Sequence, residues 1–82
     1  MRLSRYEKET VILLNAAEDT ARSIAIEHLT PYRREIILLY FFLGFKNKEI
    51  AALHDCNAGK ISYHKMRAVR QIRAEMEVRR HE

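Results

Sequence analysis

The sequence predicts an all-α domain of four to five helices with a helix-turn-helix at its C-terminal end. Glycine and proline, which mark strand ends and turns, are scarce: the 82 residues include two glycines and one proline. Apolar residues recur every three to five positions over much of the chain, as one face of a helix requires. We divide the chain into an N-terminal helical segment, 1–29, and a helix-turn-helix domain, 30–82.

The N-terminal segment begins with a capping pattern, because Ser4 precedes Glu7 by three positions. The pattern that follows predicts one long helix or two helices broken near Asn15. The alternative for residues 10–20 is a hairpin, with a short strand over residues 10–14 and a turn over residues 15–19, since two β-branched residues follow Thr10. We favour the helix because alanine is frequent and an isolated hairpin would lack a sheet to join. The expected helical face contains Tyr6, Thr10, Leu14, Ala17, Ala21, Ile24 and Leu29.

The pair Thr30 and Pro31 predicts the start of the next helix. Threonine caps helix N-termini, and proline is tolerated at the first helical position because no N–H is needed there. We expect this helix to run to about Leu43 and to end at Gly44. Its last eight residues, 36–43, are all apolar, which predicts burial on more than one side.

The stretch 45–67 has the pattern of a helix-turn-helix. Ile50, Ala51 and Leu53 are expected to form one face of its first helix, and Asn57 is a suitable N-cap for the second. The second helix continues to near Arg80, with a frayed tail from residue 77 onward. We expect the stem of Lys65 to pack beside the inner stripe while its ammonium reaches solvent. That stripe contains Ile61, Ala68, Val69, Ile72 and Met76.

Positive charge is concentrated at the C-terminal end. Residues 58–82 contain seven basic and three acidic side chains, and the chain carries a net charge of +4. A basic second helix in a helix-turn-helix predicts contact with double-stranded DNA, whereas a solvated helix face is the alternative. Arginine and lysine would contact phosphates, and Asn57 and Tyr63 would contact bases or sugars. The candidate DNA-binding residues are Asn57, Lys60, Tyr63, His64, Arg67 and Arg70.

Several other classes of protein are excluded by what the sequence lacks. It has no glycine-rich phosphate loop and no paired nucleophile and base, so we predict no enzyme and no cofactor. His54, Cys56 and His64 are poorly spaced for a metal site, and one cysteine cannot form an intrachain disulfide. A polar N-terminus and short apolar runs predict a cytoplasmic protein without a membrane span.

A set of spaced motifs extends from Leu29 to about Met76. LTPYRREIILLYFFLGFKNKEIAAL precedes the turn and AGKISYHKMRAVRQIR follows it. This part of the chain resembles region 4 of bacterial sigma factors, above all the small sigma-like regulators of mobile elements and phages. The resemblance implies a four-helix module that recognises the −35 promoter element and docks RNA polymerase. Matching positions are Pro31, Arg34, Glu35, Gly44, Phe45, Glu49, Ile50, Ala51, Leu53, Gly59, Ile61, Arg67 and Ala68.

The chain also departs from the family pattern. Residues before Leu29 do not resemble the sigma regions that grip the −10 element, so the resemblance does not imply promoter melting. Ala58 and Gly59 stand where the family often has large polar residues, so recognition of the −35 sequence does not carry over. Asp55 replaces the turn glycine.

Two further departures predict an additional apolar surface. Tyr40 and Leu43 fill positions that are commonly polar in the family, beside Phe41 and Phe42. Residues 11–14 of the N-terminal segment or a second subunit would cover this surface, and we expect a homodimer. The alternative function is a protein-interaction module that binds RNA polymerase or an anti-sigma partner without reading DNA. Binding of structured RNA by the basic helix is a further alternative.

Overall fold

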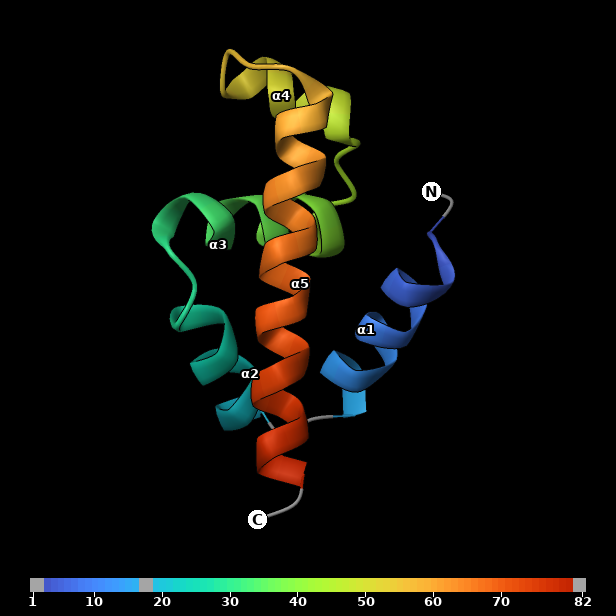
Figure 1. Cartoon of the computed structure of the whole chain (residues 1–82), viewed down its shortest axis with the longest axis vertical. Coiled ribbons are helices and arrows are strands. Elements are labelled where there is room, and N and C mark those ends of the chain that lie inside the picture. The colour runs from blue at the N-terminus through green and yellow to red at the C-terminus, as the bar shows by residue number, and fades with distance from the viewer. Residues whose placement is uncertain (1–2, 17–18, 81–82) are drawn as a thin grey trace.

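The computed structural model describes residues 3–16 and 19–80, and Figure 1 shows their arrangement. These residues form helices and contain no strand, which confirms the all-α prediction. The strand alternative for residues 10–14 is wrong, because they lie inside the first helix. Ala17 of the predicted face lies outside the described part. The elements are α1 (Arg5–Ala16), α2 (Asp19–Glu27), α3 (Pro31–Ile37), the π-helical turn η1 (Leu38–Phe42), α4 (Asn47–Leu53) and α5 (Ala58–Arg80).

The long helix α5 is the axis of the molecule, and the shorter helices lie around it (Figure 1). It has 23 residues and is therefore about 34 Å long at the usual rise per residue. Helices α1, α2, α3 and α4 all pack against it. The stripe predicted from its sequence is buried at every position.

The core consists of two apolar clusters that meet at Phe41, which packs against both. One cluster joins α2 and α3 to the middle and C-terminal part of α5. It contains Ala25, Leu29, Ile37, Ala68, Val69, Ile72 and Met76. The other joins α3, η1 and α4 to the beginning of α5. It contains Ile36, Tyr40, Ile50, Ala51 and Ile61.

The helix starts predicted at Ser4 and at Thr30 have the expected caps. The backbone N–H of Glu7 donates to the Ser4 hydroxyl at 3.2 Å, and the Ser4 N–H donates to the Glu7 carboxylate at 3.0 Å. Thr30 accepts from the backbone N–H of Arg33 at 3.3 Å, and Pro31 takes the first position of α3. The N-terminal segment forms two helices, since α1 ends at Ala16 and α2 begins at Asp19.

The predicted helix over 31–43 is wrong in its last turn. α3 ends at Ile37 and the chain continues as η1, where the Leu43 N–H donates to the Leu38 carbonyl, five residues back, at 3.1 Å. Eight consecutive apolar residues define no single face, so their periodicity cannot distinguish an α-turn from a wider π-turn. Gly44 ends the element with a φ of 76°, a conformation that favours glycine.

Leu53 does not belong to the buried face of α4. Ile50 and Ala51 are buried, whereas Leu53 is 62% exposed. Successive residues of a helix differ by about 100° in direction. The buried direction lies between Ile50 and Ala51, and Leu53 points well away from it.

Lys65 is buried rather than directed to solvent, which corrects the expectation of an exposed ammonium. The residue is 8% exposed, and its Nζ lies 2.8 Å from Oε2 of Glu7. The same Nζ donates to Oδ1 of Asn47 at 3.2 Å and lies 3.6 Å from the ring centroid of Tyr40. The carboxylate comes from α1, a partner that periodicity within α5 cannot indicate.

The pKa values of Glu7 and Tyr40, which surround the Lys65 ammonium, are both shifted. Burial alone would raise the pKa of Glu7, but the hydrogen bond from Lys65 and the Ser4 N–H outweigh it and lower this pKa below its usual value. Burial, with the neighbouring Glu7 carboxylate, raises the pKa of Tyr40 to about 12. Glu7 is therefore ionised and Tyr40 neutral at physiological pH.

Loss of the Thr30 cap should destabilise the protein measurably. Thr30→Ala removes the oxygen that accepts from Arg33 and should lower the free energy of unfolding by about 1 kcal/mol, measured by urea denaturation. Thr30→Ser keeps a hydroxyl and should remain within a few tenths of a kcal/mol of the wild type. Equal losses for the two variants would show that the cap contributes nothing.

Candidate nucleic-acid interface

The face of α5 opposite the buried stripe is exposed and basic. Lys60, Tyr63, Arg67 and Arg70 are all exposed, and Tyr63 retains 58% of its accessible surface. Within residues 3–16 and 19–80, neither Arg67 nor Arg70 has a hydrogen-bonding or ionic partner. These two guanidinium groups are therefore available to bind an anion.

The start of α5 is fixed by Asn57. Its Oδ1 accepts from the backbone N–H of Lys60 at 2.8 Å, as an N-cap does. A Cβ on Gly59 would come within 3.2 Å of that oxygen, so the missing side chain leaves room for the cap. The amide nitrogen of Asn57 takes no part in this cap and is a donor that a base could accept.

His64 is half-buried and belongs partly to the interior. Nε of Arg33 donates to its Nδ1 at 3.2 Å, and the Tyr32 ring lies 5.0 Å away between centroids. Burial, followed by the charges of Arg33 and Lys60, lowers the pKa of His64. The imidazole is therefore neutral at pH 7, and it links α3 to α5 more than it faces solvent.

The first helix of the helix-turn-helix is joined to the second by a polar contact. Nδ2 of Asn47, at the start of α4, donates to the Ser62 hydroxyl of α5 at 3.0 Å. Lys46 and Lys48 flank Asn47 and are exposed. Sequence reasoning missed these two lysines, because residues 31–57 as a whole have nearly balanced charge. Their position at the start of the first helix of the helix-turn-helix was the signal that could have found them.

The turn between α4 and α5 covers residues 54–57. Asp55 has a φ of 52°, a left-handed conformation that aspartate tolerates better than most residues. The backbone N–H of Cys56 donates to the Ala51 carbonyl at 2.9 Å and closes the end of α4. Asp55 thus takes the left-handed conformation that a turn glycine would adopt.

The residues considered for metal binding are held by other contacts. His54 is half-buried, with its Nε2 3.4 Å from the Glu35 carboxylate and its ring 5.0 Å from that of Tyr32. The Sγ of Cys56 lies 3.9 Å from the Tyr32 hydroxyl. Across the described ranges no three His, Cys, Asp or Glu side chains gather as a metal site would require. No helix in these ranges has the length and apolarity to cross a bilayer.

Comparison with protein families gives a match over a part of the chain that includes the helix-turn-helix stretch 45–67. The model of sigma-70, region 4 matches residues 25–72, which is more than half of the sequence and extends from α2 into α5. The chain belongs to the sigma-70 region 4 family. Searches of curated proteins and of solved structures found no match.

The structure gives physical roles to residues in region 4 positions. Pro31 begins α3, and Nη2 of Arg34 donates to the carbonyls of Glu27 and Leu29 at 3.1 and 3.3 Å, which fixes the α2–α3 connection. The carboxylate of Glu49 accepts from the Lys46 N–H at 2.9 Å at the start of α4. Further region 4 positions lie in the core, namely Ile50, Ala51, Ile61 and Ala68. Region 4 domains bind DNA and RNA polymerase.

Arg33 should control part of the titration of His64. Arg33→Ala removes one of the charges that lower the pKa of His64, so this pKa should rise toward its usual value. Burial remains, so the recovery should be partial. An NMR titration of the imidazole Cε1 proton measures the midpoint. Arg34→Ala is the matched control, because that guanidinium bonds to the carbonyls of Glu27 and Leu29. Identical midpoints in Arg33→Ala and the wild type would contradict the assignment.

Proposed function

We propose that this region 4 domain is a DNA-binding transcription regulator that places the outer face of α5 in the major groove. The observation that carries the proposal is the exposed basic face of α5, on which Arg67 and Arg70 lack partners among the described residues. A helix-turn-helix presents its second helix to DNA in this manner. The proposed activity is non-enzymatic and needs no cofactor.

The proposed contacts differ in what they recognise. Lys60, Arg67 and Arg70 bind phosphates, which hold the domain in register without selecting a base. Tyr63 and the amide nitrogen of Asn57 contact bases or sugars. Ala58 and Gly59 offer no polar side chain, so the recognition we propose is semi-specific. Exposed lysines at the start of α4 extend the phosphate contacts, namely Lys46 and Lys48.

We further propose that the protein binds DNA as a homodimer. Apolar side chains at the end of η1 are exposed: Phe42 by 51% and Leu43 by 66%. A second copy of the chain would remove this surface from water. Two α5 helices about 34 Å apart would then reach successive major grooves. Residues 1–29 support the core or extend this dimer surface.

The same apolar side chains support a second candidate function. Phe42, Leu43 and the exposed Leu53 of α4 form apolar surface that a protein partner could cover. In this alternative the module binds RNA polymerase or an anti-sigma partner and does not read DNA.

Arg67→Ala should weaken DNA binding similarly on all sequences. One phosphate contact is lost, so the slope of log binding constant against log salt concentration should fall in magnitude by about one. Gel shifts or fluorescence anisotropy with a panel of duplexes at several salt concentrations measure this. Lys8→Ala removes one exposed positive charge from α1 and should keep the wild-type slope. Unchanged affinity of Arg67→Ala on every duplex would remove Arg67 from the interface.

Sedimentation should reveal a dimer at tens of micromolar protein. Phe42→Ser and Leu43→Ser should each shift the equilibrium toward monomer, because each removes apolar area from the proposed interface. Met66→Ser is the control, since Met66 is also about half exposed but lies on α5. A wild-type protein that sediments only as a monomer would rule out the homodimer and favour the partner-binding role of this surface.

A further inference from the structure

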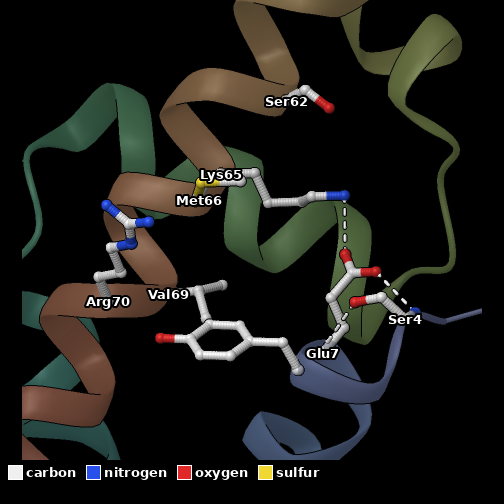
Figure 2. A pocket seen from close by; sticks show the side chains of 8 residues that line it. Ser4, Glu7, Ser62, Lys65, Met66, Val69 and Arg70 are labelled. Atoms are coloured by element: carbon white, nitrogen blue, oxygen red, sulfur yellow. Dashed lines mark hydrogen bonds and ion pairs between the residues drawn. The ribbon is translucent and has the colours of Figure 1, made fainter.

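A chain of polar contacts connects α1 to both helices of the helix-turn-helix. Figure 2 shows Lys65 extending from α5 to the Glu7 carboxylate of α1, which is also held by Ser4. From Lys65 the chain continues to Asn47 of α4, at 3.2 Å, and from Asn47 back to Ser62 of α5, at 3.0 Å. The contacts thus lead from α1 through α5 to α4.

The ammonium of Lys65 depends on these partners because it is buried. Its side chain is 10% exposed and that of Glu7 is 15% exposed. An ammonium has three hydrogens to donate, and here its Nζ faces the carboxylate of Glu7, the amide oxygen of Asn47 and the ring of Tyr40. A buried charge that loses its ionic partner is strongly unfavourable, so Lys65 would have to move if Glu7 were neutral.

Room for such a movement exists beside the pair. A cavity of about 300 Å³ lies between α1 and α5, and Glu7, Lys65 and Arg70 are among the residues that line it (Figure 2). Without the Glu7 carboxylate, the flexible Lys65 side chain can turn into this open space. Asn47 would then lose the donor that fixes its amide oxygen.

The side chain of Asn47 carries this change to the helix-turn-helix. Its oxygen accepts from Lys65 while its nitrogen donates to Ser62, so both ends of the amide are fixed by α5. Asn47 is the first residue of α4. Loosening its amide would loosen the angle between α4 and α5, the two helices whose relative placement defines the DNA-binding surface.

We propose that Glu7 is a positioning residue that sets the angle between α4 and α5 through Lys65 and Asn47. Glu7 lies before residues 25–72, so the family match assigns it no role. A second contact supports the coupling, since Leu3 packs against the apolar cluster shared by η1, α4 and α5. The consequence for DNA affinity rests on the proposed function, whereas the effect on helix placement does not.

The variant Glu7→Gln removes the negative charge of Glu7 and keeps its part in the cap of α1. Glutamine can serve in a capping box, so α1 keeps its start while Lys65 loses its carboxylate. Glu9→Gln is the matched control, because Glu9 lies on the same helix and pairs with Arg73 at 3.4 Å, away from Asn47. Lys65→Met removes the ammonium and keeps an unbranched side chain of similar length. Circular dichroism identifies a temperature at which every variant is folded.

Amide NMR spectra and DNA affinity are the two measurements. In Glu7→Gln, the side-chain amide of Asn47 and the backbone amides of Asn47 and Ser62 should shift, and α4 should exchange its amide hydrogens faster. DNA affinity should fall by about fivefold or more, a coupling of ordinary size between separated sites. Glu9→Gln should leave both measurements unchanged. When Lys65→Met is already present, Glu7→Gln should add little further change.

Two results separate this inference from the proposed function. In one result, Glu7→Gln lowers the melting temperature, but its Asn47 and Ser62 amide resonances and its DNA affinity equal those of Glu9→Gln. Glu7 then only anchors α1, and the inference is overturned. If the wild-type protein binds no duplex DNA while the resonances of Asn47 and Ser62 shift as expected, the positioning role stands and the proposed function fails.

Discussion

Burial of the apolar stripe along α5 is the interaction on which the other helices depend. None of the shorter helices could be stable alone in water, since isolated helices of this length are marginal. Each buries its apolar face against α5, and burial of one isoleucine such as Ile61 or Ile72 contributes about 1.5–3 kcal/mol. Because the stripe occupies one side of α5, the opposite side remains exposed. The same packing therefore holds the fold together and presents Lys60, Tyr63 and Arg67 to solvent.

Polar contacts fix the orientation of the short helices, which apolar packing alone leaves partly free. An apolar stripe tolerates small rotations of a short helix such as α4, whereas a hydrogen-bonded amide between two partners defines one orientation. Lys65 interrupts the stripe of α5 with a charge that requires Glu7, Asn47 and the Tyr40 ring around it. A buried ion pair is weak evidence for stability, and the role we propose for this one is to fix the placement of α4 against α5. In this protein the carboxylate comes from the helix that lies outside the region 4 match.

Sequence patterns predicted the features that depend on one helix at a time. The caps at Ser4 and Thr30, the end at Gly44 and the buried stripe of α5 follow from local chemistry, and they agree with the structure. The family was found because its motifs are spaced over half of the chain. The partners of Lys65 could not be predicted, because Glu7 is distant in sequence and its approach depends on how α1 packs. The π-turn was not predicted, because residues 36–43 are all apolar and define no single helical face. The DNA-binding role of the exposed candidates stays a prediction.

The central claim is that the outer face of α5 is the surface that meets DNA. An NMR titration of the labelled protein with a short duplex tests it directly, because each backbone amide reports its own surroundings. We expect shifts concentrated at Lys60, Tyr63, Arg67 and Arg70, with smaller ones at the start of α4, all weakening as salt is added. Shifts confined to Phe42 and Leu43, or no shifts at low salt, would contradict the claim.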